Sequence, residues 1–324
     1  MWQQLQVLDL EVHFEALDPV TLPFFRENAL RAALGTALRR VVCSFPKRST
    51  CEGCQLENIC PYGKLIFFSQ TQRNTRKGNV LPFTAYFTKS TPMKMESGQL
   101  FCLNLRLFGT AVNYFPYFYF ALEEMAHRGI GVLSESGKRG RLALRTIELI
   151  NPRGFKIPLI STNFAYRTQK EVPTYMLKDY IESVSDLPDK INHVRIKTLS
   201  PLRIKHRGHL TDHLDFHILM RAVLRRLSSL YLFTYGTPLE LNYREIVSLS
   251  ENIQIERIKL RWHDYHRYSK TQQMEMKIGG VVGEVVYRGQ LHEFYPFLKA
   301  GELLSVGRSI SFGFGRYELN VEGD

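Results

Sequence analysis

The stretch LFCLNLRLFGTAVNYFPYFYFALEEMAHRG, residues 100–129, contains the two hydrophobic repeats that decide the fold. Within residues 100–108, every second side chain is apolar, which predicts a strand with these side chains on one face of a sheet; they are Phe101, Leu103, Leu105 and Leu107. Residues from about 113 to 127 predict a helix that ends at Gly129, because glycine readily adopts the left-handed conformation that closes a helix.

The neighbouring segments complete a recognisable order of elements. Upstream, residues 5–15 predict a strand, residues 24–42 a helix and residues 83–88 a strand, and downstream residues 141–150 predict another strand. The order strand, helix, strand, strand, helix, strand is that of a ferredoxin-like domain, an antiparallel sheet with two helices on one face. We therefore expect such a domain in residues 1–150.

The same order recurs in the second half of the chain, after a proline-rich segment, residues 151–191, that we expect to be an irregular connection. Strands are predicted at 194–205, 253–262, 277–288 and 312–319, and helices at 211–231 and 291–300. The sequence therefore predicts an α+β protein with two tandem ferredoxin-like, or RRM-like, domains, the second in residues 192–324.

The charge of the chain favours a polyanionic partner. Its 43 Lys and Arg residues outnumber 31 Asp and Glu residues, for a net charge of +12, and nucleic acid is the first candidate for a protein with such a surplus. The first residues lack the basic start and apolar run of a signal peptide, and the most aromatic stretch, residues 114–122, is too short to span a membrane. We therefore expect a cytoplasmic protein.

The segment VGRSISFGFGRY, residues 306–317, combines glycines with arginines, serines and aromatic residues. Glycine lets a backbone approach a ligand closely, and arginine and serine donate hydrogen bonds to phosphate oxygens. Too few residues follow Gly315 for a dinucleotide-binding fold, so an RNA backbone is the better ligand, while a tight turn before an edge strand is the alternative. The candidate RNA-binding residues of this loop are Gly307, Arg308, Ser309, Ser311, Gly313, Gly315 and Arg316.

Several segments together resemble the CRISPR-associated precursor-RNA processing endoribonucleases of the RAMP superfamily, of the Cas family six type. The resemblance lies in Trp262 with RYS at 267–269, in GGVVG at 279–283 with Gly289, and in residues 307–317. Cys54 and the sequence CPYG at 60–63 also resemble a branch with an N-terminal cysteine cluster.

The resemblance implies cleavage of the repeat in a precursor transcript to give guide RNAs, without a metal ion. The 2′-hydroxyl would attack the adjacent phosphate and leave a 2′,3′-cyclic phosphate and a 5′-hydroxyl, which requires a base, an acid and cations around the phosphorane. The implied partners are repeat or guide RNA and other CRISPR effector subunits.

A non-catalytic RAMP subunit that holds guide RNA in an effector complex is the alternative, and a general RNA-binding module would use the same fold. Many relatives carry a catalytic histidine on the first helix, whereas residues 24–42 contain none. Ser305 and Arg308 also stand where many relatives carry histidine and lysine.

Two groups of histidines are candidates for proton transfer, because the usual pKa of histidine of about 6.5 suits both roles. His266 and His263 are expected at a strand end among aromatic and cationic residues, and simple phosphate contact is their alternative role. His213, with His209 and His217, would line one face of a helix that begins early, and a solvated helix face is the alternative. Further candidate RNA contacts are Arg267, Tyr268, Lys270, Arg221 and Arg225.

Four of the five cysteines cluster after the first helix, in an expected insertion at residues 43–62: Cys43, Cys51, Cys54 and Cys60. Their number and the central CxxC predict a structural zinc site, with an iron–sulfur cluster or reduced thiols as alternatives. Four protein ligands leave zinc no open position, so we expect no role for it in RNA cleavage. Cys102 is expected to pack in its strand.

Overall fold

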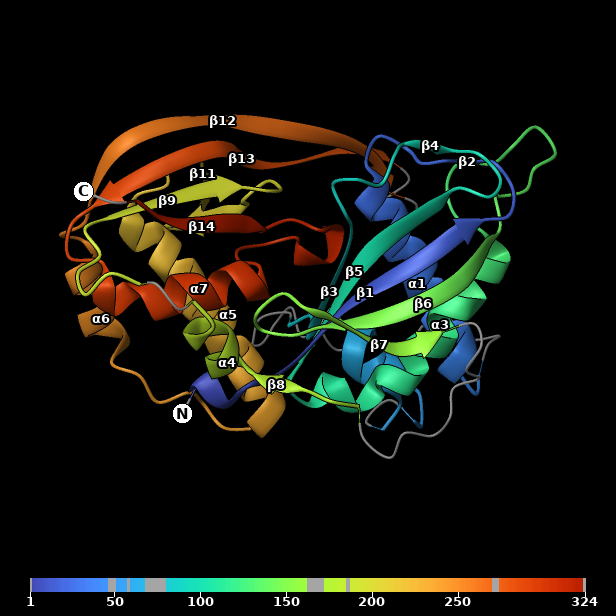
Figure 1. Ribbon diagram of the computed structural model, residues 1–324, viewed down its shortest axis with the longest axis horizontal. Helices are drawn as coiled ribbons and strands as arrows, with labels where there is room; N and C mark the ends of the chain where they lie inside the picture. The colour runs from blue at the N-terminus through green and yellow to red at the C-terminus, as the bar shows by residue number, and fades with distance from the viewer. Residues whose placement is uncertain are drawn as a thin grey trace. The chain divides into compact units, whose positions relative to one another are not determined.

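The computed structural model describes residues 2–45, 51–56, 59–67, 80–161, 172–184, 187–269 and 274–322 (Figure 1). The chain divides into two compact units. The N-terminal unit is Leu5–Met176, and the C-terminal unit is Leu177–Asp324 together with Met1–Gln4. A stacked pair of rings, Trp2 and Phe297 with centroids 4.9 Å apart, attaches the first residues to the C-terminal unit.

The N-terminal unit is a ferredoxin-like domain, as predicted. Its six main elements follow the expected order: β1 Gln6–Ala16, α1 Arg26–Val42, β3 Phe83–Phe87, β5 Leu100–Phe108, α3 Phe115–Arg128 and β6 Leu142–Ile150. The sheet order β3-β5-β1-β6 is antiparallel throughout (Figure 1). Minor elements are β2 Val20–Thr21, which pairs with β4 Lys94–Met95, and a short π-helix, Gly63–Phe67.

The period-two pattern of β1 separates the two faces of this sheet. The even-numbered residues from Leu8 to Ala16 are buried in one core with apolar side chains of α1 and α3. The odd-numbered residues Asp9, Glu11, His13 and Glu15 therefore lie on the other face, where they form ion pairs instead of packing under helices.

The expected irregular connection, residues 151–191, contains regular structure, so this expectation was wrong. β7 Lys156–Ser161 pairs with β6, and β8 Tyr175–Met176 pairs with β1. The helix α4 Leu177–Glu182 belongs to the C-terminal unit. Pro158 argued against a strand because proline has no N–H to donate. β7 is, however, the last strand of the sheet, where such a residue is tolerated.

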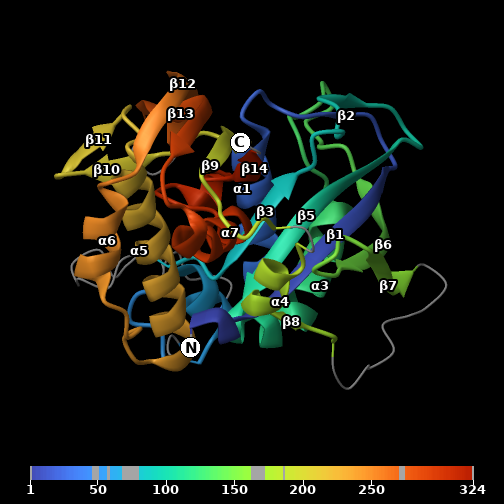
Figure 2. The ribbon, with the colours of Figure 1, turned by 60° about the vertical axis from the view of Figure 1, so that its left-hand side comes forward.

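The C-terminal unit repeats the ferredoxin-like order. Its sheet order is β12-β13-β9-β14, built from β9 His193–Thr198, β12 Gln254–Ser269, β13 Met274–Arg288 and β14 Tyr317–Glu322. The helices are α5 Phe216–Tyr235, α6 Tyr243–Ser250 and α7 Tyr295–Leu304, and Figure 2 shows α6 beside α5. The buried hydroxyls of Tyr287 and Tyr317 donate to backbone oxygens of Leu214 and Leu298.

Two elements of this unit differ from the prediction. The strand expected at 194–205 ends at Thr198, and a short hairpin follows, β10 Ile204–His206 paired with β11 His209–Thr211. Its two turn residues have positive φ, 47° at Arg207 and 87° at Gly208, which is the geometry of a tight two-residue hairpin turn. Because this hairpin occupies the chain up to Thr211, α5 begins at Phe216 instead of Thr211.

Candidate nucleic-acid interface

The glycine-rich loop is held against the chain segment that follows β9. Gly315 N donates to Pro201 O at 3.0 Å, Arg308 N donates to Arg203 O at 2.7 Å, and Arg316 N donates to Ser200 Oγ at 3.0 Å. The loop closes on itself through Val306 N, which donates to Gly315 O at 2.8 Å. The positions of its side chains are therefore fixed by backbone hydrogen bonds at both ends.

The conformation of this loop requires glycine for reasons of packing. Gly315 has a φ of +87°, and a Cβ on it would lie 2.1 Å from Val306 O. Gly307 has a φ of +90°, and a Cβ there would lie 2.6 Å from Arg203 O. Because Gly315 and Gly313 are buried, the side of the loop open to a ligand consists of exposed Arg308 and the half-buried Ser309, Ser311 and Arg316.

Gly315→Ala is expected to lower the free energy of unfolding by about 3 kcal/mol, since the methyl group adds a backbone clash to the roughly 1–2 kcal/mol of left-handed strain. The matched control is Gly208→Ala, which has the same φ of +87° but nothing within 4 Å of the added Cβ. This control should lose only about 1 kcal/mol. Urea unfolding of both variants measures the difference, and equal losses would contradict the packing role.

One face of β12 carries a row of cationic and aromatic side chains. Because side chains alternate along a strand, Lys259, Arg261, His263 and Tyr265 share one face. The His263 and Tyr265 rings are in edge contact with centroids 4.8 Å apart, and Tyr265 lies 5.9 Å from Phe314 of the glycine-rich loop. This face of β12 therefore meets the loop.

The structure separates the two neighbouring candidate histidines. His266 is exposed on the opposite face of β12, with Trp262 and Asp264, whose side chains are joined by a 2.8 Å hydrogen bond from Trp262 Nε1 to Asp264 Oδ1. His263 and His266 therefore cannot contact one substrate phosphate from the same side. Only His263 lies on the face that meets the loop.

A groove of about 510 Å³ lies at the base of the row on β12. Its lining includes Thr198, Ser200, Lys259, Arg261, Tyr265 and Gly283. The two cationic side chains are exposed at its edge, and Thr198 Oγ1 accepts a hydrogen bond from Gly283 N at 2.8 Å. The groove thus offers cations and an aromatic ring to one ligand, the combination that suits the backbone and bases of single-stranded RNA.

Two further guanidinium groups concentrate positive charge beside the loop. Burial lowers the pKa of Arg203 and the charge of Arg308 lowers it further, while the nearby carboxylate of Asp264 acts in the opposite direction. Arg203 Nη1 donates to Gly279 O at 2.6 Å, which holds its guanidinium in place. The guanidinium groups of Arg203 and Arg308 repel each other when no ligand is bound. A bound anion would relieve this repulsion and be attracted by both groups.

Two family models match successive parts of the chain. Residues 196–317 match the model described as CRISPR-associated endoribonuclease Cas6, and residues 5–172, more than half of the chain, match the AF_1859_N model, described as an N-terminal domain. The C-terminal part of the chain is a Cas6 domain. The Cas6 segment includes β9, the row on β12 and the glycine-rich loop, and its family consists of enzymes that cleave RNA in CRISPR systems.

Similar proteins match nearly the whole length of the chain. An uncharacterised protein of Archaeoglobus fulgidus is 24% identical over 308 residues, which is 92% of each chain. A product complex of a Thermus thermophilus Cas6 has a TM-score of 0.53 at 17% identity and covers 97% of this chain and 99% of that one. A partial Cas6-RT-Cas1–Cas2 complex has a TM-score of 0.58 at 12% identity, with 98% of this chain matching 46% of that chain. These solved structures share the fold of this chain.

The second histidine group does not form one helical face, because α5 begins at Phe216, between His213 and His217. His209 lies in β11 and His217 in α5, whereas His213 lies between them. The His213 side chain is 81% exposed and is 3.6 Å from its neighbour Asp212. This prediction was wrong, since it depended on a helix that began before Phe216.

Among the remaining predicted RNA contacts, the two arginines of α5 do not line the groove. Arg221 of α5 is paired with Glu251 at 3.5 Å, and Arg225 is exposed on the same helix. Arg267 and Tyr268 lie in β12, where they pair in register with Met276 and Glu275 of β13. Lys270 lies outside the described residues.

The sequence analysis missed Lys259, Arg261, Arg203 and Ser200. The first two follow the pattern KxRxHxY at 259–265, and this alternation in a predicted strand could have identified the row on β12. Ser200 and Arg203 follow β9 with no motif of their own. Their place is set by the hydrogen bonds to the glycine-rich loop.

The four clustered cysteines form no disulfide and are half-buried. Burial raises the pKa of Cys51; the positive charge of Arg39 acts against this rise, and the thiols of Cys43, Cys60 and Cys54 add to it. No three of these four, all within the described residues, have their sulfur atoms within 4.8 Å of one another. The sequence between them is only partly described, and zinc stays a prediction.

No helix within the described ranges is both long enough and apolar enough to cross a membrane.

Proposed function

We propose that this protein cleaves the repeat of a CRISPR precursor transcript by attack of the 2′-hydroxyl on the adjacent phosphate, without a metal ion. The products would be a 2′,3′-cyclic phosphate and a 5′-hydroxyl. The observation that carries the proposal is the row on β12, which presents a histidine, a tyrosine and two cations on the face that meets the glycine-rich loop.

In this mechanism, the phosphate is bound beside the glycine-rich loop, where Arg308 and Arg261 offset the charge that develops on the phosphorane. His263 accepts the proton of the 2′-hydroxyl, and Tyr265, whose ring contacts His263, supplies a phenol for the leaving oxygen. A base of the RNA stacks on a half-buried aromatic ring of this site, as is common in the recognition of single-stranded RNA.

The partners of the protein in this proposal are CRISPR repeat RNA and its guide product, in the cytoplasm. Solved neighbours include a Cas6 product complex and a Cas6-RT-Cas1–Cas2 complex, which supports RNA and other CRISPR proteins as partners. The four clustered cysteines would hold a structural zinc ion. Elemental analysis of purified protein and of a Cys51→Ser/Cys54→Ser variant tests this, because the variant should contain less zinc.

A second candidate function is a subunit that holds guide RNA without cutting it. The composition of α1 favours it, because this helix carries Arg31, Arg39 and Arg40 but no histidine. Ser305, at the loop position where relatives carry histidine, is buried, which leaves it little access to a substrate.

Product analysis separates the two candidates. The purified protein is incubated in EDTA with its repeat RNA, and with a control RNA that carries 2′-deoxyribose at the cleavage position. Cleavage of the first RNA alone, with cyclic phosphate ends, is the expected result, since the control lacks the nucleophile. Tight binding of both RNAs without cleavage would instead establish the guide-holding function.

Arg261→Gln is expected to weaken binding equally for RNAs of different sequence. It should also reduce the slope of the log of the binding constant against the log of the salt concentration by about 0.7, the value for one lost phosphate contact on a single strand. Fluorescence anisotropy with the uncleavable RNA at several salt concentrations measures the slope. Arg257→Gln is the matched control, because Arg257 lies on the same strand and face but pairs with Glu322 at 2.5 Å. An equal loss of slope in the control would contradict a specific role of the groove.

A further inference from the structure

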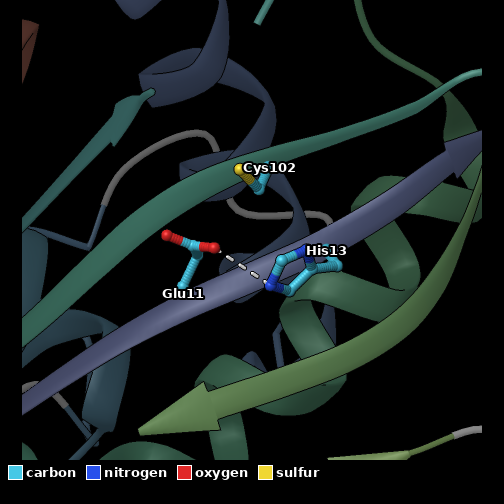
Figure 3. Close-up of side chains that lie close together, drawn as sticks. All are labelled: Glu11, His13 and Cys102. Carbon is cyan, nitrogen blue, oxygen red and sulfur yellow. Dashed lines mark ion pairs between the residues drawn. The ribbon is translucent and has the colours of Figure 1, made fainter. Parts of the chain in front are cut away.

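The face of the N-terminal sheet that is not packed under α1 and α3 carries a cluster of metal-ligating side chains. Glu11 and His13 lie two residues apart on β1 and so share this face. In the antiparallel registers, Cys102 of β5 lies directly opposite His13, and Glu148 of β6 lies directly opposite Glu11. Figure 3 shows Glu11, His13 and Cys102 directed toward one another.

Two carboxylate groups converge on a single ring nitrogen in this cluster. His13 Nε2 lies 3.1 Å from Glu11 Oε1 and 2.9 Å from Glu148 Oε2. One nitrogen carries at most one proton, so it can donate well to only one of these oxygens. A cation in place of that proton would be bound by the nitrogen and by both carboxylates at once.

The sulfur of Cys102 completes the donor set. One ligand atom each of Glu11, His13 and Cys102 lies within 4.8 Å of the others, and they are the only such group of three or more among the described residues. In a tetrahedral zinc site, with bonds of about 2.0–2.3 Å, ligand atoms lie roughly 3.3–3.7 Å apart. The nitrogen–oxygen distances of the cluster, 2.9 and 3.1 Å, are a few tenths of an ångström shorter than this, so a small outward shift of the side chains would admit an ion.

The charges around the cluster favour a further cation. Lys156 Nζ lies 2.5 Å from Glu11 Oε1, so one positive charge stands against two carboxylates when His13 is neutral. The Lys156 side chain is 46% exposed, and it can move into solvent and free Glu11 for a metal ion. The His13 and Glu148 side chains are 29% and 23% exposed, which gives an ion access from solvent.

We propose that His13, Cys102 and Glu11 bind a divalent transition-metal ion of the Zn²⁺ type, with Glu148, whose Oε2 lies 2.9 Å from His13 Nε2, turning in as the fourth ligand. The combination of imidazole, thiolate and carboxylate ligands suits zinc and disfavours Mg²⁺ and Ca²⁺, which take oxygen ligands only. The ion would connect β5, β1 and β6, the three adjacent strands that supply the ligands. This site is separate from the four clustered cysteines and from RNA cleavage.

Binding of Co²⁺, a spectroscopic substitute for Zn²⁺, tests the site in the full chain with Cys43, Cys51, Cys54 and Cys60 changed to Ser. One equivalent should bind, with a thiolate-to-cobalt absorption band that disappears when Zn²⁺ is added. His13→Ala and Cys102→Ser should each weaken binding at least 100-fold, since loss of a direct ligand exceeds the roughly 10–100-fold effect of outer partners. Glu15→Gln is the matched control on the same strand and face, because Glu15 pairs with Arg145 at 2.7 Å, and it should bind normally.

Lys156→Met distinguishes a metal site from a set of ordinary ion pairs. Loss of the competing ammonium group should tighten Co²⁺ binding about fivefold, whereas a purely structural cluster would gain no affinity for metal. Unchanged affinity in Lys156→Met together with undiminished binding in His13→Ala would overturn the proposal.

If the cysteine-to-serine background does not fold, zinc is counted by elemental analysis in the unaltered chain and in its His13→Ala/Cys102→Ser variant. A difference of one equivalent supports the site, and equal contents overturn it. RNA cleavage is not part of either measurement, so failure of the proposed nuclease function would leave these outcomes unaffected.

Discussion

Replacement of His263 with alanine is expected to slow cleavage of repeat RNA by about 10²–10⁴-fold, the usual contribution of a general acid or base. RNA affinity should stay within about twofold, since the cations of the groove supply most of the binding. Single-turnover cleavage with excess protein measures the first effect, and anisotropy with the uncleavable RNA measures the second.

His266→Ala is the matched control for this experiment. It removes the same side chain from the same strand, but His266 is exposed on the opposite face, so the rate of cleavage should not change. The reverse result, a slow His266→Ala and a normal His263→Ala, would place the reacting phosphate on the other face of β12. Normal rates in both variants would exclude this strand as the source of the proton-transfer group.

The largest expected effect on stability is that of Arg106→Met in the N-terminal unit. Arg106 Nε lies 2.9 Å from Asp9 Oδ1, and the Asp9 side chain is almost fully buried. Removal of one partner of a buried ion pair leaves an uncompensated charge, which typically costs about 3–5 kcal/mol. Urea unfolding near neutral pH should show a loss of this size.

The loss in Arg106→Met should shrink as the pH falls. Burial raises the pKa of Asp9 in the folded protein, and the charge of Arg106 is the main influence that lowers it, so the variant should have a still higher pKa. A carboxyl whose pKa is raised by folding favours the folded state when it is protonated. The deficit is therefore greatest above the folded pKa of Asp9 and is recovered as the pH decreases through it.

The double variant Asp9→Asn/Arg106→Met is the control for this pH dependence. It has no buried carboxylate, so it should be more stable than Arg106→Met at neutral pH, and the difference between the two should diminish toward acidic pH. A constant difference at all pH values would show that Arg106 acts through packing, for example over the Tyr86 ring at 5.8 Å, and not through its charge.

The order of elements could be predicted from the sequence because each strand and helix carries its own hydrophobic period. The prediction of secondary structure failed where a short hairpin interrupts a longer hydrophobic pattern. Apolar residues continue from β9 into β10, so the predicted strand extended to residue 205 and the predicted helix began at Thr211, and the β10–β11 hairpin between them was not predicted. The histidines at 209, 213 and 217 were then placed on one helix face that does not exist.

The candidate site could be predicted only in part, because its residues come from three segments that sheet pairing brings together. The glycine-rich loop was identified from its composition, but the burial of Gly315 and its contact with Val306 depend on tertiary structure. The separation of His263 from His266 follows from the period of a strand and could have been predicted. The contribution of Ser200 could not.

The β12–β13 hairpin has a consequence for how this protein can vary. Only Glu284–Arg288 of β13 pair with β9, and the contacts with Leu202, Arg203 and Phe314 reach no further than Tyr265, so the described pairs from Ser269↔Met274 to His266↔Lys277 form the outer part of a two-stranded arm. Deletion of two residues from each strand would shorten the arm by about 7 Å and keep every remaining side chain on its face, whereas deletion of one would exchange the faces. We expect related chains to differ in the length of this arm by steps of two residues per strand. Such steps would adapt the arm to RNAs of different size without exchanging its two faces.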